Sequence, residues 1–417
     1  MTLQEYLTYP TNSQNSLVKN GSAQLKKGQG RTMKAGDAWI FDNEIERTFG
    51  TFENGDLIQV LDFDGYCLGY GYINSHSTIL IRMLSRKKED LITPAFLKSR
   101  VRNAWNFRKQ VIDTSCCRVI FGEADFLPGF TVDKYEDILV VESLTLGMEK
   151  LKPILLASLV QILKEDGSPI RGIYERSDAK VREKEGLSRS KGFLSEPFDT
   201  MIPITENGIH YLVDIKDGQK TGFFLDQKLN RLAIRPFCRN ALVLDCFTHT
   251  GSFGLNAAYA GASHVTSVDS SMLAIEQAKT NARLNNMEDK IDYIVADVFD
   301  FLPEQRKKGC QYDVVILDPP ALTKSRSSVR AASTGYRELN REGMLLLKDG
   351  GFLVTCSCSH FMTNELFQQA IQQAAKDAHR RLRQVEFRLQ APDHPILWSN
   401  DSSYYLKFYI FQVVTEQ

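Results

Sequence analysis

Five apolar segments in the C-terminal half each end in a polar or acidic residue, and this pattern constrains the fold most. They read ALVLDCF, SHVTSVDSS, KIDYIVADVFD, YDVVILDPP and GGFLVTCSCS. Helical stretches such as SMLAIEQAKTNARLN lie between the first of them. Strands that alternate with helices form a parallel sheet, whose ligand site lies at the carboxyl ends of the strands. We therefore predict an α/β catalytic domain with a mostly parallel sheet.

The first half of the chain has a different texture. Short strand-like runs separated by turn signals such as Asp64-Gly65 extend from Ala23 to about Leu84. Thr93 before Pro94 then predicts the start of a helix. Further strands and helices follow, which indicates a mixed α+β region. The predicted division is a polar tail at 1–22, a small β-rich domain at 23–92, a middle α+β domain at 93–203 and the catalytic domain at 204–417.

Composition and cysteine spacing exclude several classes of protein. The chain has 417 residues, 43% of them hydrophobic, enough for more than one core. It has no apolar run of about 18 residues that would span a membrane. The N-terminus lacks a signal-peptide pattern, so a cytoplasmic location without membrane partners is expected. The eight cysteines form no CxxC pair and no zinc spacing, so neither a metal site nor a disulfide framework is predicted.

Charge is balanced overall but uneven along the chain. Nine lysines and arginines against two acids lie between Arg82 and Ile112, and five against one lie between Thr323 and Arg341. Such runs in a neutral protein can form a phosphate-binding surface on one side. The alternative is that each run is an ordinary solvated helix face.

Four aspartates stand at or near the ends of successive predicted strands: Asp245, Asp269, Asp297 and Asp318. Asp245 opens the turn DCFTHTG, which lacks the GxGxxG of a dinucleotide site. A carboxylate at Asp269 suits the two hydroxyls of an adenosine ribose, and Asp297 or a neighbour could meet the adenine. Helix caps and turns also favour aspartate, but that explanation fits a row of four less well.

These strand ends resemble those of class I S-adenosylmethionine-dependent methyltransferases, which have a Rossmann-like domain. The longer motifs GQKTGFFLDQKLNR, LDCFTHTGSF, LDPPA, VTCSCS and DHP followed by YLK are similar to ribosomal RNA cytosine-C5 methyltransferases with an N-terminal PUA domain. GEADFLPGFTVDKY and YERSDAKVREKEGL resemble the middle domain of that family. Leu322 and His360 depart from its usual pattern. The resemblance implies the cofactor S-adenosyl-L-methionine, bound by Asp245, Phe247, Thr250, Gly251, Asp269, Ser270, Asp297, Val298, Asp318 and Pro319.

Cys356 and Cys358 stand at the end of the last of the five strands, with Cys356 inside it. Metal binding, redox chemistry, packing and nucleophilic catalysis are all open for them at first. C5 of cytosine is too poor a nucleophile to take a methyl group unless a thiolate first adds to C6. Similarity to RNA methyltransferases of this chemistry aligns Cys358 with their nucleophile and leaves Cys356 to pack. Asp318 is predicted to hold the target base.

The resemblance further implies large-subunit (23S-type) ribosomal RNA, or a ribosomal precursor particle, as the partner, and leaves a homodimer open. Predicted RNA contacts are Lys220, Arg231, Lys324, Arg326 and Arg330. Phe223 and Phe224 either cover the cofactor or a flipped base, or belong to the core. Two other functions remain: methylation of a guanine or adenine nitrogen without a cysteine, and RNA binding or ribosome assembly without catalysis.

Overall fold

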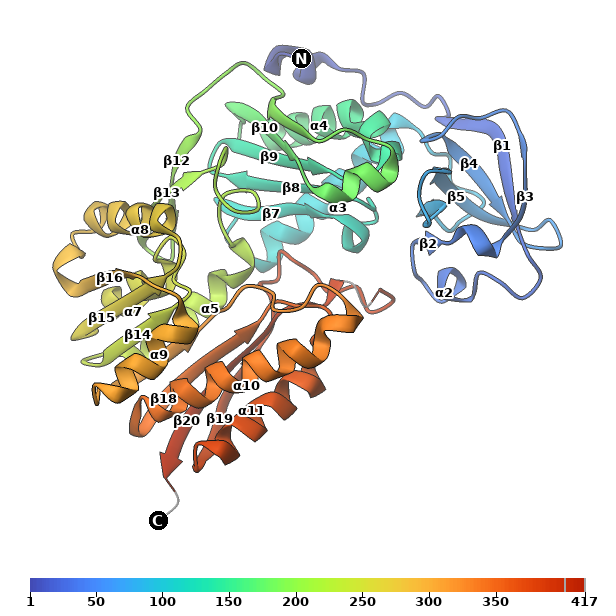
Figure 1. The fold of residues 1–417 in the computed structure, drawn as a ribbon. Coiled ribbons are helices and arrows are strands. Elements are labelled where there is room, and N and C mark those ends of the chain that lie inside the picture. Colours follow the sequence, from blue (N-terminus) through green and yellow to red (C-terminus); the bar gives the residue numbers. More distant parts are fainter. Residues whose placement is uncertain (401–402, 416–417) are drawn as a thin grey trace. The chain divides into compact units, whose positions relative to one another are not determined.

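The structure, a computed structural model, describes residues 1–400 and 403–415. The chain divides into two units, coloured by sequence in Figure 1. Unit 1 comprises residues 1–202, 213–225 and 392–403, and unit 2 comprises residues 203–212, 226–391 and 404–417. In the described part of the chain, no helix is long and apolar enough to cross a membrane.

Unit 1 begins with a six-stranded sheet of order β2-β6-β5-β4-β1-β3. Gly65, at φ 89°, makes the turn between β4 and β5, as the Asp64-Gly65 signal predicts. The strands are β1 (Val18–Leu25), β2 (Trp39–Ile40), β3 (Ile45–Gly50), β4 (Leu57–Leu61), β5 (Cys67–Ile73) and β6 (Ile81–Ser85), with helices α1 (Leu3–Thr8), α2 (Arg31–Lys34) and η1 (Asp42–Glu44). Residues 1–22, predicted to be a polar tail, are not a simple tail in the structure. They contain α1, whose Tyr6 is buried, and the start of β1.

The second part of unit 1 is a five-stranded sheet of order β11-β10-β9-β8-β7 with two long helices. Thr93 caps α3 (Pro94–Val111) by accepting a hydrogen bond from the backbone N–H of Phe96, which confirms the predicted helix start. One hydrophobic core joins α3, α4 and this sheet. The remaining elements are β7 (Cys116–Phe121), η2 (Gly122–Asp125), β8 (Phe130–Tyr135), β9 (Ile138–Ser143), α4 (Leu146–Glu165), β10 (Gly172–Ser177), η3 (Lys180–Glu185) and β11 (Ser190–Phe193).

A two-stranded hairpin, β12 (Met201–Glu206) and β13 (Ile209–Asp214), comes next in the chain, before the third large sheet. Unit 2 contains a seven-stranded sheet of order β16-β15-β14-β17-β18-β20-β19. Five strands are parallel, and the last two are antiparallel. They are β14 (Leu242–Cys246), β15 (His264–Asp269), β16 (Ile291–Val295), β17 (Tyr312–Leu317), β18 (Leu347–Ser357), β19 (Arg380–Arg388) and β20 (Lys407–Thr415).

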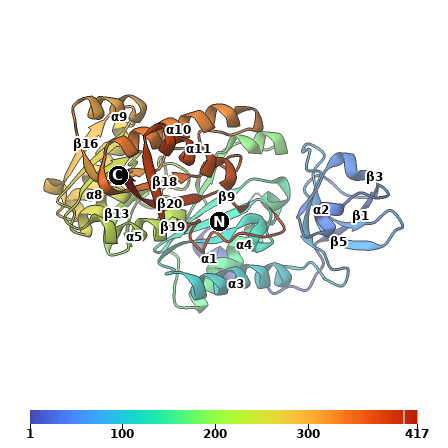
Figure 2. The ribbon, with the colours of Figure 1, turned by 90° about the horizontal axis from the view of Figure 1, so that it is seen from below.

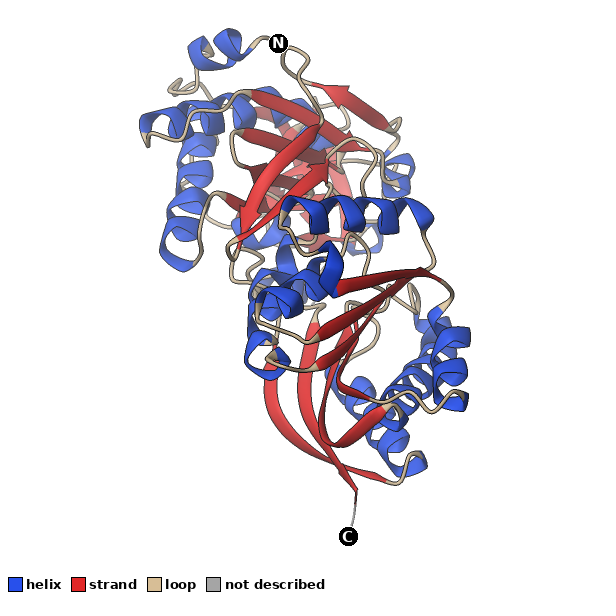
Figure 3. Ribbon diagram, turned by 90° about the vertical axis from the view of Figure 1, so that its left-hand side faces the viewer, coloured by secondary structure: helices blue, strands red, loops and turns tan. Residues whose placement is uncertain are grey.

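Helices lie on both faces of the seven-stranded sheet (Figure 3). Residues of α9, α10 and α11 share one core with the sheet, and α10 and α11 run side by side (Figures 1 and 2). The helices of unit 2 are η4 (Leu225–Gln227), whose first residue belongs to unit 1, α5 (Lys228–Ala233), α6 (Arg235–Cys238), α7 (Ser252–Tyr259), α8 (Met272–Leu284), η5 (Glu288–Lys290), α9 (Val298–Lys307), η6 (Arg326–Ser328), α10 (Val329–Leu345) and α11 (Asn364–Asp377). The predicted α/β class with a mostly parallel, Rossmann-like sheet is confirmed.

Candidate active site

The parallel register brings the predicted strand-end residues to one edge of the sheet in unit 2. Cys246 pairs with Val268 of β15 and with Leu317 of β17, and Leu317 pairs with Thr355 of β18. The next residues along these strands are therefore level with one another, and they include Asp269 and Asp318. Cys358 follows β18 directly at this same edge.

The loop after β14 has an unusual backbone. Phe247 and His249 adopt positive φ angles of 60° and 50°, and Gly251 has φ 84°. Non-glycine residues in this region store strain, and such strain concentrates at ligand sites. A Cβ on Gly251 would approach the Cβ of Ala278 to 3.0 Å, so glycine also permits a close approach to α8. Phe247, Thr250 and Gly251 therefore lie in a loop whose backbone conformation is constrained.

Asp245 is fully buried beneath this loop. Its Oδ2 accepts hydrogen bonds from the Thr248 hydroxyl and from the Gly254 N–H. Its Oδ1 has no hydrogen-bond partner among the residues that the structure describes. Burial is the main reason that the pKa of Asp245 rises to about 7. An unpaired buried carboxylate oxygen is costly, and it marks a place where a polar ligand would be stabilised.

Three other buried hydroxyl groups in this part of unit 2 also lack a partner within residues 1–400 and 403–415: those of Thr250, Ser267 and Tyr293. A Cβ on Gly254 would meet the Ser267 hydroxyl and the Asp245 carboxylate, so these two groups are neighbours. Asp245 also raises the pKa of Tyr293, after the larger effect of burial. A carboxylate with hydroxyl groups nearby fits a ligand that carries an ammonium group, as S-adenosylmethionine does.

The other predicted cofactor residues have local structural tasks as well. Asp269 accepts hydrogen bonds from the His249 and Ser271 N–H groups, each with a different oxygen, and Ser270 is exposed beside it. Asp297 caps α9 through the Phe299 N–H, and Val298 packs in the core. A ribose contact at Asp269 and an adenine contact near Asp297 remain predictions.

Asp318 and Pro319 lie beside the predicted nucleophile. The Cys358 sulfur is 4.0 Å from the carbonyl oxygen of Pro319. Gln227 donates from its side-chain amide to both carboxylate oxygens of Asp318, at 3.2 and 3.1 Å. Gln227 was not among the predicted site residues, although it belongs to the GQKTGFFLDQKLNR motif. It holds the Asp318 carboxylate in a fixed orientation.

The two cysteines differ in environment. Cys356 lies within β18, is fully buried, and has a pKa raised well above the usual value by burial. Cys358 lies beyond the strand end and is partly exposed. The thiolate is the nucleophilic form of cysteine, and burial in apolar surroundings disfavours it. These environments favour Cys358 over Cys356 for chemistry.

Lys407 is a second residue that was not among the predicted site residues, although it belongs to the YLK motif. It opens β20, pairs in register with Ser357, and is 1% exposed. Its ammonium group donates to the carbonyl oxygens of Ser359 and Tyr405, at 2.6 and 2.8 Å. Burial lowers the pKa of Lys407 to about 8, and the nearby Cys358 acts in the opposite direction. The sequence signal for the role of Lys407 was a lysine at the start of β20, whose following residues are mostly apolar.

One predicted RNA contact needs correction. Arg231 is 1% exposed and forms a two-pronged ion pair with Glu206, at 2.6 and 2.9 Å. Because its guanidinium is committed inside unit 2, Arg231 is a structural residue in this fold rather than a phosphate contact. Lys220 is exposed in unit 1 and stacks on Phe224 at 4.6 Å, whereas Phe223 is buried.

The remaining predicted contacts, Lys324, Arg326 and Arg330, are exposed in unit 2. They belong to the loop after Asp318 and to the start of η6 and α10. The Ser359 hydroxyl donates to the Thr323 carbonyl oxygen at 2.7 Å, which ties this loop to the segment that holds Cys358. The loop therefore lies beside the candidate active site at Thr323, and RNA contact by the three cations remains a prediction.

Comparison with known proteins agrees with this architecture. The family model for S-adenosylmethionine-dependent methyltransferases matches residues 183–411, and the one for PUA-like domains matches residues 23–86. A methyltransferase solved with S-adenosylhomocysteine, SMU.776, has a TM-score of 0.79 at 21% identity, covering 94% of this chain and 99% of that one. This likeness shows the fold. The matches define the class as an S-adenosylmethionine-dependent methyltransferase with a PUA-like domain.

Relatives of known name are similar over almost the whole chain. The ribosomal RNA large subunit methyltransferase I of Shewanella denitrificans is 40% identical over 395 residues, 93% of this chain and 98% of that protein. The proteins of that name from Pseudoalteromonas translucida and Escherichia coli are 38% and 36% identical, covering 93% and 94% of this chain and 98% of each relative. The chain belongs to the ribosomal RNA large subunit methyltransferase I family.

Proposed function

We propose that this protein transfers a methyl group from S-adenosylmethionine to C5 of a cytosine in large-subunit ribosomal RNA, through a covalent adduct with Cys358. The relatives named above act on large-subunit ribosomal RNA by their names. The observation that carries the proposal is the 4.0 Å approach of the Cys358 sulfur to Pro319, beside Asp318. A thiol and an oriented carboxylate at one strand edge are what addition to a pyrimidine requires.

In this proposal, different residues of unit 2 bind the cofactor, add to the base and hold the base. Asp245 and the loop from Phe247 to Gly251 would hold the cofactor, with Asp269 at the ribose. S-adenosylmethionine supplies an electrophilic methyl group when it is bound. The Cys358 thiolate adds to C6 of the cytosine, which makes C5 nucleophilic, and Asp318 holds the edge of the base. After C5 is methylated, loss of its proton returns an electron pair to the ring and expels the thiolate.

Lys407 supports the nucleophile in this proposal. A cation near a thiol favours the thiolate form, and the ammonium of Lys407 is fixed by the carbonyl oxygen of Ser359, the residue next to Cys358. Lys407 is therefore a positioning residue that acts through Cys358. Lys324, Arg326 and Arg330 would meet RNA phosphates around the site. The cytoplasm remains the predicted location.

The test is methyl transfer by the full-length protein to RNA from cells that lack it, with labelled S-adenosylmethionine. Nucleoside mass spectrometry should find 5-methylcytidine, and bisulfite mapping should locate it in large-subunit RNA. A methyl group on a guanine or adenine nitrogen would replace the cytosine-C5 assignment. Absence of transfer by folded, cofactor-binding protein would favour a non-catalytic role in RNA binding or ribosome assembly.

A further inference from the structure

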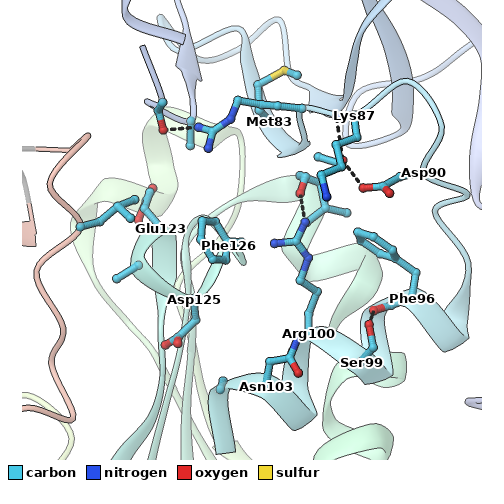
Figure 4. A pocket seen from close by; sticks show the side chains of 18 of the residues that line it. Met83, Lys87, Asp90, Phe96, Ser99, Arg100, Asn103, Glu123, Asp125 and Phe126 are labelled. Carbon is cyan, nitrogen blue, oxygen red and sulfur yellow. Dashed lines mark hydrogen bonds between the residues drawn. The ribbon is translucent and has the colours of Figure 1, made fainter. Parts of the chain in front are cut away.

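Unit 1 contains a pocket with a volume of about 830 Å³ (Figure 4). This volume lies within the usual range of ligand sites. Its walls come from the end of β6 and the segment after it, from one face of α3, and from η2. Gly36, Ala38, Phe126, Pro395 and Leu397 complete the lining. None of these residues belongs to the candidate active site.

The pocket is lined by the lysine and arginines of the basic run from Arg82 to Lys109 that form no ion pair with a carboxylate in the described part of the chain. Six of its nine lysines and arginines lie within 4.0 Å of a carboxylate: Arg82, Lys88, Lys98, Arg102, Arg108 and Lys109. The other three are Arg86, Lys87 and Arg100, which form no ion pair within residues 1–400 and 403–415. All three line the pocket. The unpaired charge of the run is thus concentrated at one place.

Arg100 is held in position at the centre of this group. Its guanidinium lies 4.9 Å from the ring of Phe96 and 5.0 Å from the ring of Phe126, and it donates to the Leu84 carbonyl oxygen at 3.2 Å. Burial lowers the pKa of Arg100, the negative charge of Asp90 acts against this, and the positive charge of Arg86 lowers the pKa further. A bound anion would add to the effect of Asp90 and offset the effects of burial and of Arg86.

The acidic residues of the pocket already have partners. Asp125 pairs with Arg108, Glu123 accepts a hydrogen bond from the indole of Trp39 at 2.9 Å, and Asp90 accepts one from the Ser85 hydroxyl. Figure 4 shows Asp90 beside Lys87, with Arg100 between Phe96 and Phe126. Asp125 and Glu123 are therefore engaged by other residues, and Asp90 is the lining carboxylate whose negative charge acts on Arg100.

Exposed aromatic rings accompany the cations. Phe126 is 43% exposed and has φ 59°, a strained conformation for a bulky residue, and Phe107 is 37% exposed. Trp398 is 96% exposed. It stands between Leu397, which lines the pocket, and Ser399, whose hydroxyl donates to the Gly36 carbonyl oxygen at 2.9 Å. Trp398 therefore lies at the rim of the pocket.

We propose that this pocket binds a single-stranded segment of the RNA substrate. Its bases stack on Trp398, Phe107 and Phe126, and its phosphates bind Arg86, Lys87 and Arg100. Aromatic platforms beside cations are the means by which proteins bind single strands, because every base offers a flat face and every linkage a negative charge. Paired bases in a duplex keep their faces covered, so the pocket selects unpaired RNA. The inference rests on the proposed action on RNA.

Two variants of the full-length protein test the site without disturbing the core: Trp398→Ala and Lys87→Glu. Fluorescence anisotropy with a labelled single-stranded oligoribonucleotide of mixed sequence should show affinity reduced by about tenfold for each. Lys87→Glu should also make the dependence of affinity on salt shallower, by about 0.7 in logarithmic slope. Binding of the matched duplex should change less than binding of the single strand.

The matched controls are Phe49→Ala, which removes a ring that is 44% exposed, and Lys88→Glu, the neighbouring charge. Neither residue lines the pocket, so both variants should bind the single strand as the unmodified protein does. Unchanged affinity in Trp398→Ala and Lys87→Glu would overturn the inference. Equal losses in the controls would also overturn it, because they would assign the effect to general surface charge.

Failure of this inference and failure of the proposed function give different results. If the pocket variants bind RNA normally while methyl transfer still requires Cys358, the pocket assignment fails and the proposed chemistry stands. If the unmodified protein binds no RNA, both fail. Ultraviolet crosslinking of RNA that contains 4-thiouridine should recover peptides with Trp398 or Phe126. Crosslinks confined to unit 2 would contradict the pocket.

Discussion

Particular buried charges are balanced differently in the two units. Unit 1 contains several ion pairs with a buried member: Arg108 with Asp125, Arg118 with Asp133, and Arg82 with Glu185. Unit 2 keeps the carboxylate of Asp245 fully buried, with one oxygen unpaired among the described residues. The same contrast occurs inside unit 2, where Glu206 and Arg231 satisfy each other. A paired buried charge serves the fold, whereas an unpaired one at a strand edge is available to a ligand.

The largest expected effect is on stability, when a buried ion pair of unit 1 is broken. In Arg108→Met, the nearly buried carboxylate of Asp125 loses its cation, so the free energy of unfolding should fall by about 3–5 kcal/mol. Urea denaturation of unit 1 measures this fall. The exposed pair Arg171–Asp137 provides the control, since Arg171→Met should cost about 1 kcal/mol or less. Similar costs for both variants would break the comparison.

Asp245→Asn tests the buried carboxylate of unit 2 that has one unpaired oxygen among the described residues. The pKa of Asp245 is about 7 in the folded chain against an ordinary 3.8, so between those pH values the folded chain holds a proton that the unfolded chain has lost. Its contribution to stability therefore falls as pH rises from about 4 to about 7, and Asp245→Asn should lack this fall. Urea midpoints of both proteins across this range give the difference.

The same carboxylate should make ligand binding depend on pH. If the ionised form pairs with the ammonium of S-adenosylhomocysteine, affinity should drop towards about tenfold per pH unit below 7, and Asp245→Asn should remove this slope. Isothermal calorimetry in buffers of different ionisation enthalpy detects the proton that binding releases. Parallel pH dependences in the two proteins would remove Asp245 from the proposed cofactor site.

Lys407→Met should raise the pH at which Cys358 becomes reactive. Below about pH 8 the ammonium of Lys407 is charged and favours the thiolate, and above it this support is lost. We expect alkylation of Cys358 by iodoacetamide at pH 7 to slow by about tenfold, equivalent to one pKa unit. Cys67 and Cys310, which are also partly exposed, should be replaced by serine in both proteins. Lys407→Arg should restore part of the rate, and a pH profile unchanged in Lys407→Met would give Lys407 a structural role only.

The smallest effect concerns the exposed cations of unit 2. Reversing the charge of Arg326 and Arg330 together should weaken RNA binding several-fold and make its salt slope shallower by about 1.4. Arg337→Glu is the control, because Arg337 lies in the same segment but already pairs with Asp377. Anisotropy titrations at several salt concentrations measure the slopes. A slope retained in the double variant would assign these arginines to ordinary surface.

Periodicity and turn chemistry predicted much of this molecule because they act locally. The alternation of apolar strands and helices predicted the parallel sheet, and Thr93 before Pro94 predicted the start of α3. What the sequence could not supply was the pairing of charges across the fold. Arg231 is of a residue type that commonly binds phosphate, yet the carboxylate of Glu206 from β12 neutralises its charge. In the basic run, only the tertiary structure shows that Arg86, Lys87 and Arg100 are left over.

Register explains the other omissions. Lys407 matters because antiparallel pairing sets it opposite Ser357, one residue before Cys358. Gln227 matters because it reaches Asp318 across 91 positions of sequence. Neither relation follows from spacing along the chain. The motif GQKTGFFLDQKLNR contained Gln227, but only the folded chain shows what its amide holds.

The most direct test of the central claim is trapping with RNA that carries 5-fluorocytosine. Fluorine at C5 cannot leave as a proton does, so the Cys358 adduct should persist through denaturing gel electrophoresis, and mass spectrometry should find Cys358 in the crosslinked peptide. Cys358→Ala should give neither trapping nor methylation, whereas Cys356→Ala should retain both. Trapping through Cys356, or full methylation by Cys358→Ala, would contradict the account.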